Sequence, residues 1–350
     1  YFRVGDGTGN IIDDTIFSED NLLLYRTLMR AELNESEIFE TYLQLKNTTL
    51  WYEDSNNQYG FVKSVANSTG LIKDDNRYLI DNLEPIFLLI ETIGDNIDNL
   101  LVEGKNPTEL INEQFNLINS SQFWDKNNIG FYQYNSSSSK SKYSEINFYS
   151  ILANLLIHRT YRNLNIDSQI RDRAYELADL TMSKLNTSMW DLSKNVFYFN
   201  ASSDWLDTSG PGEEYYHLST NALGIFTLLE YWIETGMKND SSGPSYLQQA
   251  IQLYNSLENN LWNDTNPYNL YMNTYRSDLM VVDKGIDLKA NSMMMSSVLK
   301  LFEVTGNITY YDKAITIFDE LESVLYDNQS NVYNDSISNN NKILLSNLKL

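Results

Sequence analysis

The chain of 350 residues contains no cysteine, and it has only 5 proline and 15 glycine residues. The lack of cysteine excludes disulfide bonds, thiolate metal sites and cysteine nucleophiles. With so little proline and glycine, no segment is typical of a flexible interdomain linker. No apolar run reaches the roughly 18 residues that predict a membrane-spanning helix. We therefore expect one large folded unit or an array of repeats, without a membrane span.

Basic residues are also scarce. The chain has 25 lysine and arginine residues against 47 aspartate and glutamate residues, which gives a net charge of -22. Such a surface repels nucleic acid and anionic membranes, so neither is expected as a partner. Hydrophobic residues make up 42% of the chain, which is enough for a large core.

Asparagine is abundant, with 43 residues, and twelve of them begin an N-x-S/T triplet where about seven would occur by chance. Drift toward asparagine codons is one explanation. Because most of the triplets lie in predicted turns or at helix ends, we favour N-glycosylation and an extracellular or cell-surface location. The chain begins at Tyr1 without a visible signal peptide, so we expect a processed or partial product. The twelve positions are Asn34, Asn47, Asn67, Asn119, Asn135, Asn186, Asn200, Asn239, Asn263, Asn307, Asn328 and Asn334.

One aromatic phrase occurs five times, which indicates an internal repeat. It reads WYEDSNNQYGF, WDKNNIGFY, WDLSKNVFYF, WNDTNPYNLY and YDNQSNVY, beginning at Trp51, Trp124, Trp190, Trp262 and Tyr326. The phrases are 73, 66, 72 and 64 residues apart. Each phrase predicts a turn between two short strands, and its first aromatic residue closes a helix.

Two kinds of helix alternate with these phrases. An amphipathic helix precedes each phrase, as in SYLQQAIQLYNSLENNLW at 245–262, and is expected to be half-buried. A more apolar helix follows after a variable loop, as in NALGIFTLLEYWI at 221–233, and is expected to be an inner, buried helix. We predict that an asparagine caps the N-terminus of each inner helix. The six positions are Asn21, Asn82, Asn147, Asn221, Asn291 and Asn347.

The predicted repeat is thus an inner helix, an outer helix, an aromatic hairpin and a loop. Six such repeats closed in a ring form an (α/α)6 toroid, an all-α fold with short β-hairpins at one rim. An open α-solenoid is the alternative, and the long loops gathered at one end favour the closed ring. We expect residues 1–350 to form a single toroid whose sixth hairpin is cut off at Leu350.

The segment DKGIDLKANSMMMSSVLKLFEVTGNITYYDKAITIFDEL at 283–321 resembles the six-hairpin glycosidase-like (α/α)6-toroid superfamily. Its pattern of residues is similar to that of the helical domains of N-acylglucosamine 2-epimerases and of large thioredoxin-domain proteins. The resemblance covers most of the chain as architecture and is strongest in this repeat. It implies a substrate site at the mouth of the barrel. Epimerases of this kind use two histidines there, whereas this chain has His217 alone at the predicted mouth, which counts against epimerase activity.

Acidic residues at the predicted mouth are candidates for glycosidic hydrolysis, which needs two carboxyl groups roughly 5–10 Å apart. We expect Glu213 or Glu214 to pair with Asp283 or Asp287, with His217 nearby. The irregular loop DTSGPGEEYYHLSTNA at 207–222 would deliver several of these groups. The alternative is that such acidic residues only solubilise loops and complement helix dipoles. Further predicted rim residues are Asp13, Asp14, Asp74, Asp75, Glu145 and Lys284.

Aromatic residues crowd the predicted hairpins, and flat amphipathic rings stack well on the apolar faces of sugars. The alternative is packing between repeats, which we favour for the recurring tryptophans that begin the phrases. The expected substrate-binding residues are Tyr132, Tyr134, Tyr198, Trp205, Tyr215 and Tyr271.

The sequence contains no complete calcium loop and no phosphate-binding glycine loop, so we expect neither a metal nor a cofactor. The segments DKNNIG and NDTNPYN read as asparagine-rich turns.

Two functions fit these features. The first is a glycosylated surface protein that self-associates and uses the toroid as a rigid subunit of a coat or filament. The second is a carbohydrate-active toroid, either glycoside hydrolase-like or sugar-binding, with a glycan ligand at the barrel mouth. The glycosylation triplets and the acidic surface favour the first, and the resemblance favours the second. Whether the protein is an enzyme stays open at this point.

Overall fold

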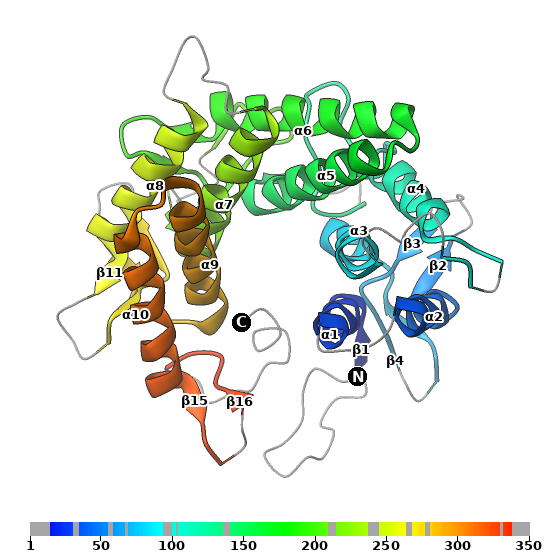
Figure 1. Cartoon of the computed structure of the whole chain (residues 1–350), viewed down its shortest axis with the longest axis horizontal. Helices are drawn as coiled ribbons and strands as arrows, with labels where there is room; N and C mark the ends of the chain where they lie inside the picture. Colours follow the sequence, from blue (N-terminus) through cyan, green and yellow to red (C-terminus); the bar gives the residue numbers. More distant parts are fainter. Residues whose placement is uncertain are drawn as a thin grey trace. The chain divides into compact units, whose positions relative to one another are not determined.

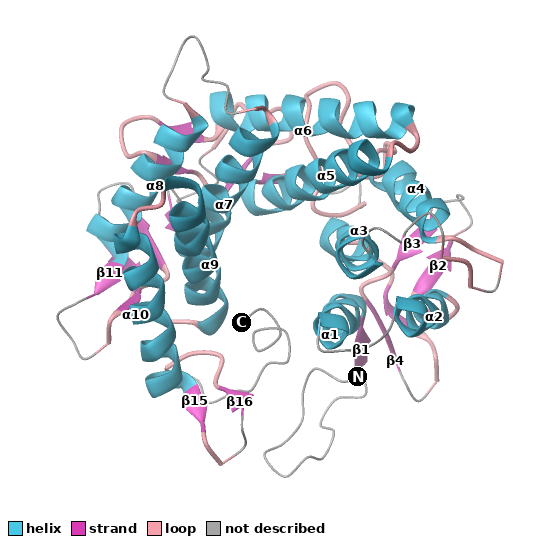
Figure 2. Ribbon diagram, in the orientation of Figure 1, coloured by secondary structure: helices cyan, strands magenta, loops and turns pink. Residues whose placement is uncertain are grey.

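The computed structural model describes residues 15–30, 35–54, 59–66, 69–93, 100–102, 104–135, 141–208, 215–236, 245–263, 268–276, 281–329 and 332–337. This part of the chain contains ten α-helices and short strands of two or three residues (Figure 1, Figure 2). It divides into two compact units. The first unit comprises residues 1–142 with 153–181, and the second comprises residues 143–152 with 182–350.

The ten helices alternate between a more buried inner helix and a more exposed outer helix, so the described residues contain five of the predicted pairs. The sixth inner helix, predicted from Asn347, lies outside the described residues. The inner helices are α1 (Ser18–Arg30), α3 (Leu79–Ile93), α5 (Ser144–Leu164), α7 (Leu218–Glu234) and α9 (Leu288–Thr305). The outer helices are α2 (Glu35–Lys46), α4 (Pro107–Ile118), α6 (Ser168–Ser188), α8 (Tyr246–Leu261) and α10 (Ile308–Leu325).

An aromatic hairpin follows each outer helix, as the repeated phrase predicts. In every hairpin the first aromatic ring packs on a ring of the returning strand, with centroids 4.8–5.0 Å apart. The repeated segment therefore has a structural role, because its rings hold the two strands of each hairpin together. The five ring pairs are Trp51–Phe61, Trp124–Phe131, Trp190–Phe197, Trp262–Tyr271 and Tyr326–Tyr333. The strands are β2 (Trp51–Glu53), β3 (Tyr59–Phe61), β7 (Trp190–Asp191), β8 (Val196–Phe197), β11 (Trp262–Asn263), β12 (Leu270–Tyr271), β15 (Tyr326–Asp327) and β16 (Val332–Tyr333), with a single bridge between Trp124 and Phe131.

In the five described inner helices the asparagine lies inside the first turn, so the prediction that it is the N-cap is wrong for these five positions. Asn221 is the fourth residue of α7, whose N-cap is His217. Its Oδ1 accepts from the Phe197 backbone N–H at 2.7 Å, and its Nδ2 donates to the Phe197 carbonyl at 3.1 Å. An amide carries both a donor and an acceptor, so it can satisfy both backbone groups of one hairpin residue. Asn82 binds Phe61 and Asn291 binds Tyr271 in the same way.

Two three-stranded antiparallel sheets lead into inner helices. In the first unit the strand order is β1 (Thr15–Phe17), β4 (Ser64–Ala66) and β5 (Ile72–Asp74). In the second unit it is β10 (Tyr215–His217), β13 (Thr274–Arg276) and β14 (Val281–Asp283). The first strand of each sheet runs directly into α1 or α7, and the third strand precedes α3 or α9. The sheets therefore fix the residues at the N-terminal ends of these helices. Two further strands are β6 (Lys142–Tyr143) and β9 (Asn200–Ala201).

In the second unit α7 packs between the start of α5 and α9. A Cβ atom at Gly224 of α7 would lie 3.2 Å from the Phe148 ring of α5, so the two helices approach closely. On the other side, Ser297 of α9 donates to the Ala222 carbonyl at 2.6 Å. Figure 1 shows α7, α8, α9 and α10 packed side by side in this unit.

Candidate functional site

Five residues occupy one equivalent position at the N-terminal ends of the inner helices. Each lies four residues before the asparagine in the first turn of its helix, whose Nδ2 donates to its carbonyl at 2.8–3.1 Å. They are Phe17 and Tyr78 in the first unit, and Tyr143, His217 and Asp287 in the second. The second unit thus carries a phenol, an imidazole and a carboxyl group at equivalent positions of three successive inner helices.

A second equivalent position lies two residues before the asparagine and carries Glu145 in α5, Ser219 in α7 and Lys289 in α9. The Lys289 Nζ donates to the Glu145 Oε1 at 3.1 Å, and both side chains are partly exposed. Because α7 lies between the two helices, this ion pair reaches across the N-terminal end of α7. We call the six residues at these two positions the N-terminal cluster: Tyr143, Glu145, His217, Ser219, Asp287 and Lys289.

His217 is the half-buried last residue of β10 and the N-cap of α7. Its ring packs on Phe199, with centroids 4.4 Å apart. Its Nδ1 lies 3.2 Å from the Thr274 Oγ1, the residue opposite it in β13. The sheet and the Phe199 ring therefore hold the imidazole in one orientation, as a group that transfers protons requires.

Asp287 is the N-cap of α9, and its side chain accepts from the Ala290 N–H at 2.7 Å. Burial raises the pKa of this carboxyl, and the neighbouring carboxyl groups of Asp335 and Asp283 add to the rise. The Ala290 hydrogen bond and Lys289 act in the opposite direction without cancelling it. A carboxyl whose pKa is raised retains a proton more readily and is suited to donate it.

The predicted carboxyl pair stays a prediction, because Glu213 and Glu214 lie outside the described residues, as do Asp13 and Asp14. Asp283 is exposed, and its Oδ1 accepts from the Gly285 N–H at 2.7 Å. Asp283 also lies opposite Thr274 in the sheet, and Thr274 lies opposite His217. The β-sheet thus places His217, Thr274 and Asp283 in one row. Lys284 follows as an exposed residue.

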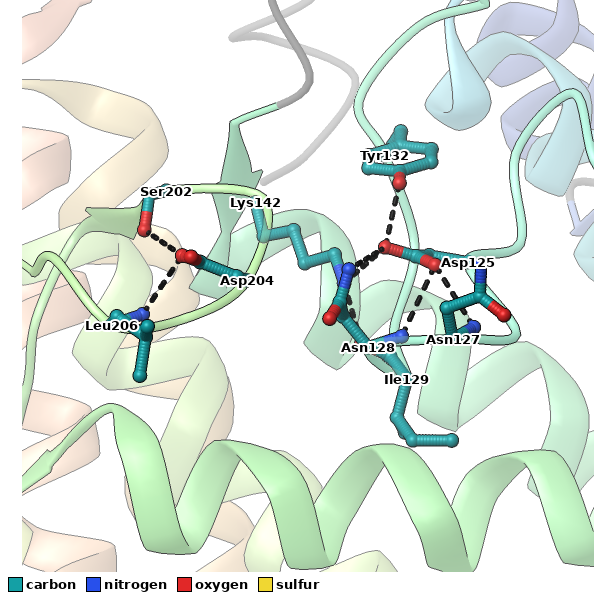
Figure 3. A network of polar contacts seen from close by, with 9 residues as sticks. All are labelled: Asp125, Asn127, Asn128, Ile129, Tyr132, Lys142, Ser202, Asp204 and Leu206. Carbon is teal, nitrogen blue, oxygen red and sulfur yellow. Dashed lines mark hydrogen bonds and ion pairs between the residues drawn. The ribbon is translucent and has the colours of Figure 1, made fainter.

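Three of the predicted sugar-binding aromatic residues are buried and therefore do not offer a ring face to solvent. They are Tyr132, Trp205 and Tyr271, with exposures of 7%, 3% and 0%. The Tyr132 hydroxyl donates to Asp125 at 2.6 Å (Figure 3), and the Tyr271 hydroxyl donates to Glu258 at 2.5 Å. Sequence reasoning placed these rings at the rim because it could not see that tertiary structure buries all three and gives the two tyrosine hydroxyl groups carboxylate partners.

The other three predicted aromatic residues are half-buried. Tyr134 packs on Tyr78, with centroids 5.6 Å apart. Tyr198 donates from its hydroxyl to Asp191 at 3.2 Å, and Tyr215 begins β10. Of these, Tyr215 lies nearest in sequence to the N-terminal cluster.

The first unit has its own polar group at the equivalent end of α3. Lys63 lies 3.7 Å from the buried Asp81 and over the Tyr78 ring at 4.9 Å. Asp74 accepts from the backbone and side chain of Asn76, which shapes the loop before α3, and Asp75 is exposed. Lys63 and Asp81 therefore form an ion pair, and Asp74 and Asn76 form a turn.

The glycosylation triplets are placed unevenly. Asn34, Asn67 and Asn239 lie outside the described residues, and the side chain of Asn263 is not described. Asn47, Asn307 and Asn328 are exposed, whereas Asn119, Asn135, Asn186, Asn200 and Asn334 are half-buried.

Within the described ranges, no helix is long and apolar enough to cross a membrane. The same part of the chain contains no group of three histidine, aspartate or glutamate side chains placed to hold a metal ion.

The sequence had proposed His217, Asp287 and Glu145 as candidates at the mouth, but it had not proposed Lys289, Ser219, Tyr143 or Thr274. The sequence does contain a signal for Lys289 and Ser219. They lie two residues before Asn291 and Asn221, just as Glu145 lies two residues before Asn147. Thr274 carries no such signal, since its neighbour His217 is 57 residues away in sequence.

No protein-family model and no curated protein matches this chain. Several solved structures match it over all or nearly all of its length. A D-mannose isomerase matches with a TM-score of 0.76 and 13% identity, covering 100% of this chain and 89% of its own. A cellobiose 2-epimerase from Spirochaeta thermophila matches with a TM-score of 0.74 and 15% identity, covering 100% and 87%. A GH76 α-mannanase from Bacteroides thetaiotaomicron matches with a TM-score of 0.66 and 15% identity, covering 95% and 83%.

These neighbours are six-hairpin glycosidase-like proteins, so the chain has the (α/α)6 toroid fold that its sequence predicts. At such low identities the likeness concerns the fold, because one fold supports many functions.

Proposed function

We propose that this protein is a carbohydrate-active enzyme of the glycoside hydrolase-like kind, with its sugar site at the N-terminal cluster of the second unit. The observation that carries the proposal is the convergence of Tyr143, Glu145, His217, Ser219, Asp287 and Lys289 at two equivalent positions of three successive inner helices. The descriptions of the solved neighbours as sugar isomerase, epimerase and mannanase support the same chemistry.

In the proposed reaction Asp287 donates a proton to the leaving glycosidic oxygen, since its pKa is raised by burial and by neighbouring carboxyl groups. His217 takes the proton of the attacking water, because its imidazole is held by Thr274 and Phe199. The two residues are N-caps of the neighbouring helices α7 and α9. Packed helix axes are about 8–10 Å apart, which is close to the separation that admits a water beside the sugar.

The coat or filament subunit considered from the sequence has no support in the comparisons, whose neighbours are described as sugar enzymes. We retain the extracellular location as part of the proposal, on the basis of the twelve glycosylation triplets.

A turnover assay tests the proposal. The purified protein is incubated with α-mannan, cellobiose and aryl glycosides, and the release of reducing ends is measured. Parallel incubations with D-mannose and D-glucose detect isomerisation. We expect hydrolysis by the wild type and a loss of roughly a hundredfold or more in H217Q and D287N, as for removal of a general acid or base. Unchanged turnover in both variants, or no turnover of any glycan, would contradict the proposal.

A matched control is Glu303→Gln. Glu303 is an exposed partner of Lys300 in α9, and it is not part of the N-terminal cluster. Its replacement is expected to leave turnover unchanged.

A further inference from the structure

We propose that the Glu145–Lys289 ion pair is a binding subsite for a vicinal diol of an uncharged sugar, with the ring of Phe199 and the ring of Tyr143 forming the adjoining apolar wall. This inference rests on the proposed function and names the substrate class of the same site.

The position of the pair is the first support. Glu145 and Lys289 come from α5 and α9, with α7 packed between those helices. The pair therefore joins the N-terminal ends of two inner helices of the second unit, rather than lying along the outer surface of one helix. His217, four residues before Asn221, begins the same end of α7. A sugar bound to the pair would lie beside the proposed acid and base.

The chemistry of the two side chains is the second support. A carboxylate only accepts hydrogen bonds and an ammonium group only donates them, whereas each sugar hydroxyl can do both. The 3.1 Å contact between Lys289 Nζ and Glu145 Oε1 places one donor beside one acceptor. One hydroxyl of a diol can donate to Glu145 while its neighbour accepts from Lys289. Hydrogen bonds to charged groups are roughly twice as strong as neutral ones, which offsets the opening of a partly exposed ion pair.

The neighbouring rings are the third support. Tyr143 lies two residues before Glu145, and its ring meets Phe199 edge to face, with centroids 5.4 Å apart. Phe199 in turn packs on His217. Both rings are half-buried, so part of each surface is covered and part is exposed. A sugar ring has polar edges and apolar C–H faces, and this arrangement offers a partner to each.

The charge of the pair selects the substrate class. Glu145 and Lys289 neutralise one another, so the subsite supplies no net charge to an anionic sugar. Asp283 and Asp287 lie close by in the same unit, and the whole chain carries a net charge of -22. A uronate or a sugar phosphate would therefore be repelled, and an uncharged hexose or hexoside is the expected ligand.

Binding measurements on the full chain test the inference. Isothermal titration and saturation-transfer NMR are carried out with D-mannose, D-glucose, their monodeoxy derivatives and D-glucuronate. The variants are E145Q, K289M and the conservative K289R. The control is K284M, which removes an exposed lysine five residues before Lys289 without touching the pair. Thermal melts establish that each variant is folded.

We expect E145Q and K289M each to weaken hexose binding at least about tenfold, the loss of one charge-assisted hydrogen bond. K289R should retain most of the affinity, and K284M should bind like the wild type. Removing either hydroxyl of one adjacent pair should weaken binding to the wild type but not to K289M or E145Q to the same extent. Glucuronate should bind more weakly than glucose.

Hexose binding that is equal in the wild type, E145Q and K289M would overturn the subsite and leave the proposed function standing. Tighter binding of glucuronate than of glucose would overturn the choice of an uncharged sugar. If no sugar binds to the folded wild type, the proposed function fails together with the inference.

Discussion

Individual residues hold backbone conformations that cost free energy, and Ile129 is the clearest case. It lies in the hairpin between Trp124 and Phe131 with a φ of 61°, a conformation that β-branched residues rarely adopt. The equivalent residue of the next hairpin, five positions after Trp190, is Asn195 with a φ of 56°. Asparagine tolerates this conformation much better than isoleucine.

We predict that Ile129→Asn raises the free energy of unfolding by about 1 kcal/mol, because the strain of the left-handed conformation falls while little apolar burial is lost. The residue is only half-buried. The reverse change, Asn195→Ile, should lower the free energy of unfolding by a similar amount. Urea denaturation of both variants checks the pair, and a stable Asn195→Ile variant would contradict the explanation.

The carboxyl group of Asp287 should make the stability of the folded protein depend on pH. Its pKa is raised in the folded protein, chiefly by burial. Well below the ordinary pKa of about 4 the group is protonated in both the folded and the unfolded state and does not affect stability. As the pH rises from there through the raised folded value, the folded state binds more protons than the unfolded state, so stability falls.

Asp287→Asn removes this ionisable group and keeps a good helix N-cap. We therefore expect the difference in stability between the variant and the wild type to be smallest well below the ordinary pKa of about 4 and to grow in favour of the variant as the pH rises toward neutrality. Urea denaturation at a series of pH values measures the difference. A difference that is independent of pH would show that burial of this carboxyl does not affect folding.

At the scale of elements, the hairpin at 124–131 is fixed by a buried ion pair (Figure 3). The Lys142 Nζ donates to the Asp125 Oδ2 at 3.0 Å and to the Ile129 carbonyl at 2.6 Å. Lys142 is fully buried and Asp125 is 7% exposed. Burial alone would raise the pKa of Asp125, but the hydrogen bonds from Tyr132, Lys142 and Asn128 lower it to about 2.

We predict that Lys142→Met lowers the free energy of unfolding at pH 7 by about 3–5 kcal/mol, because it leaves a buried carboxylate without its cation. Chemical denaturation provides the measurement. The largely exposed pair Arg171–Asp172 is the control, and Arg171→Met should leave the free energy of unfolding nearly unchanged.

The same pair should respond to acid. The depressed pKa of Asp125 contributes stability above the unfolded value of about 4, and this contribution is lost as the pH falls toward 2. The difference between the wild type and Lys142→Met should therefore shrink between pH 5 and pH 3. A constant difference over that range would contradict this account of the ion pair.

How far the sequence predicts these elements depends on the range of the interaction. The helices and the aromatic hairpins follow from periodicity and from a repeated phrase, both of which are local. The role of Asn221 was misjudged because its partner Phe197 lies 24 residues earlier and both groups bonded are backbone atoms. The contact of Glu145 with Lys289 joins residues 144 positions apart, and no local pattern links them.

The same limit applies to the candidate site. His217 and Asp287 were predicted because histidine is rare in the chain and because acidic residues precede an apolar helix. Tyr132 and Tyr271 were assigned to sugar binding from their chemical type, yet their burial depends on partners brought in by tertiary structure. Residue type indicates what a group can do, and packing decides whether a ligand can reach it.

At the scale of the whole molecule, the repeat lets one helix serve as the control for another. Counted back from the hairpin aromatic residues Trp262 and Tyr326, Tyr254 of α8 is equivalent to Phe318 of α10. Tyr254 packs edge to face on Tyr310 of the next outer helix, with centroids 5.2 Å apart, and is 9% exposed. Phe318 is 41% exposed.

The loss of stability on removing a ring should depend on the burial of that ring and not on its position in the repeat. We therefore predict that Tyr254→Ala lowers the free energy of unfolding by about 3 kcal/mol or more. Phe318→Ala should cost less than about 1 kcal/mol, as expected at an exposed position. Both are measured by urea denaturation of the full chain. Equal losses would mean that an unrecognised contact covers Phe318.

The twelve glycosylation triplets differ in whether the folded protein has room for a glycan at the asparagine. The exposed Asn47 and Asn328 can carry a glycan without displacing a described contact between helices. In contrast, the Asn186 Oδ1 accepts from Gln249 and so joins α6 to α8, and Asn119 accepts from Arg173. A bulky glycan at either of these residues would separate packed elements.

We therefore predict that, after secretion from a glycosylating eukaryotic host, folded protein carries glycans at Asn47 and Asn328 and lacks them at Asn186 and Asn119. Glycopeptide mass spectrometry of the monodisperse fraction gives the occupancy of each position. Asn186→Gln is the companion variant, and it should leave the glycan mass of the folded fraction unchanged, whereas Asn328→Gln should lower it by one glycan. Full occupancy of Asn186 in folded protein would contradict the placement of α6 against α8, because the side chain cannot meet Gln249 and anchor a glycan in the same interface.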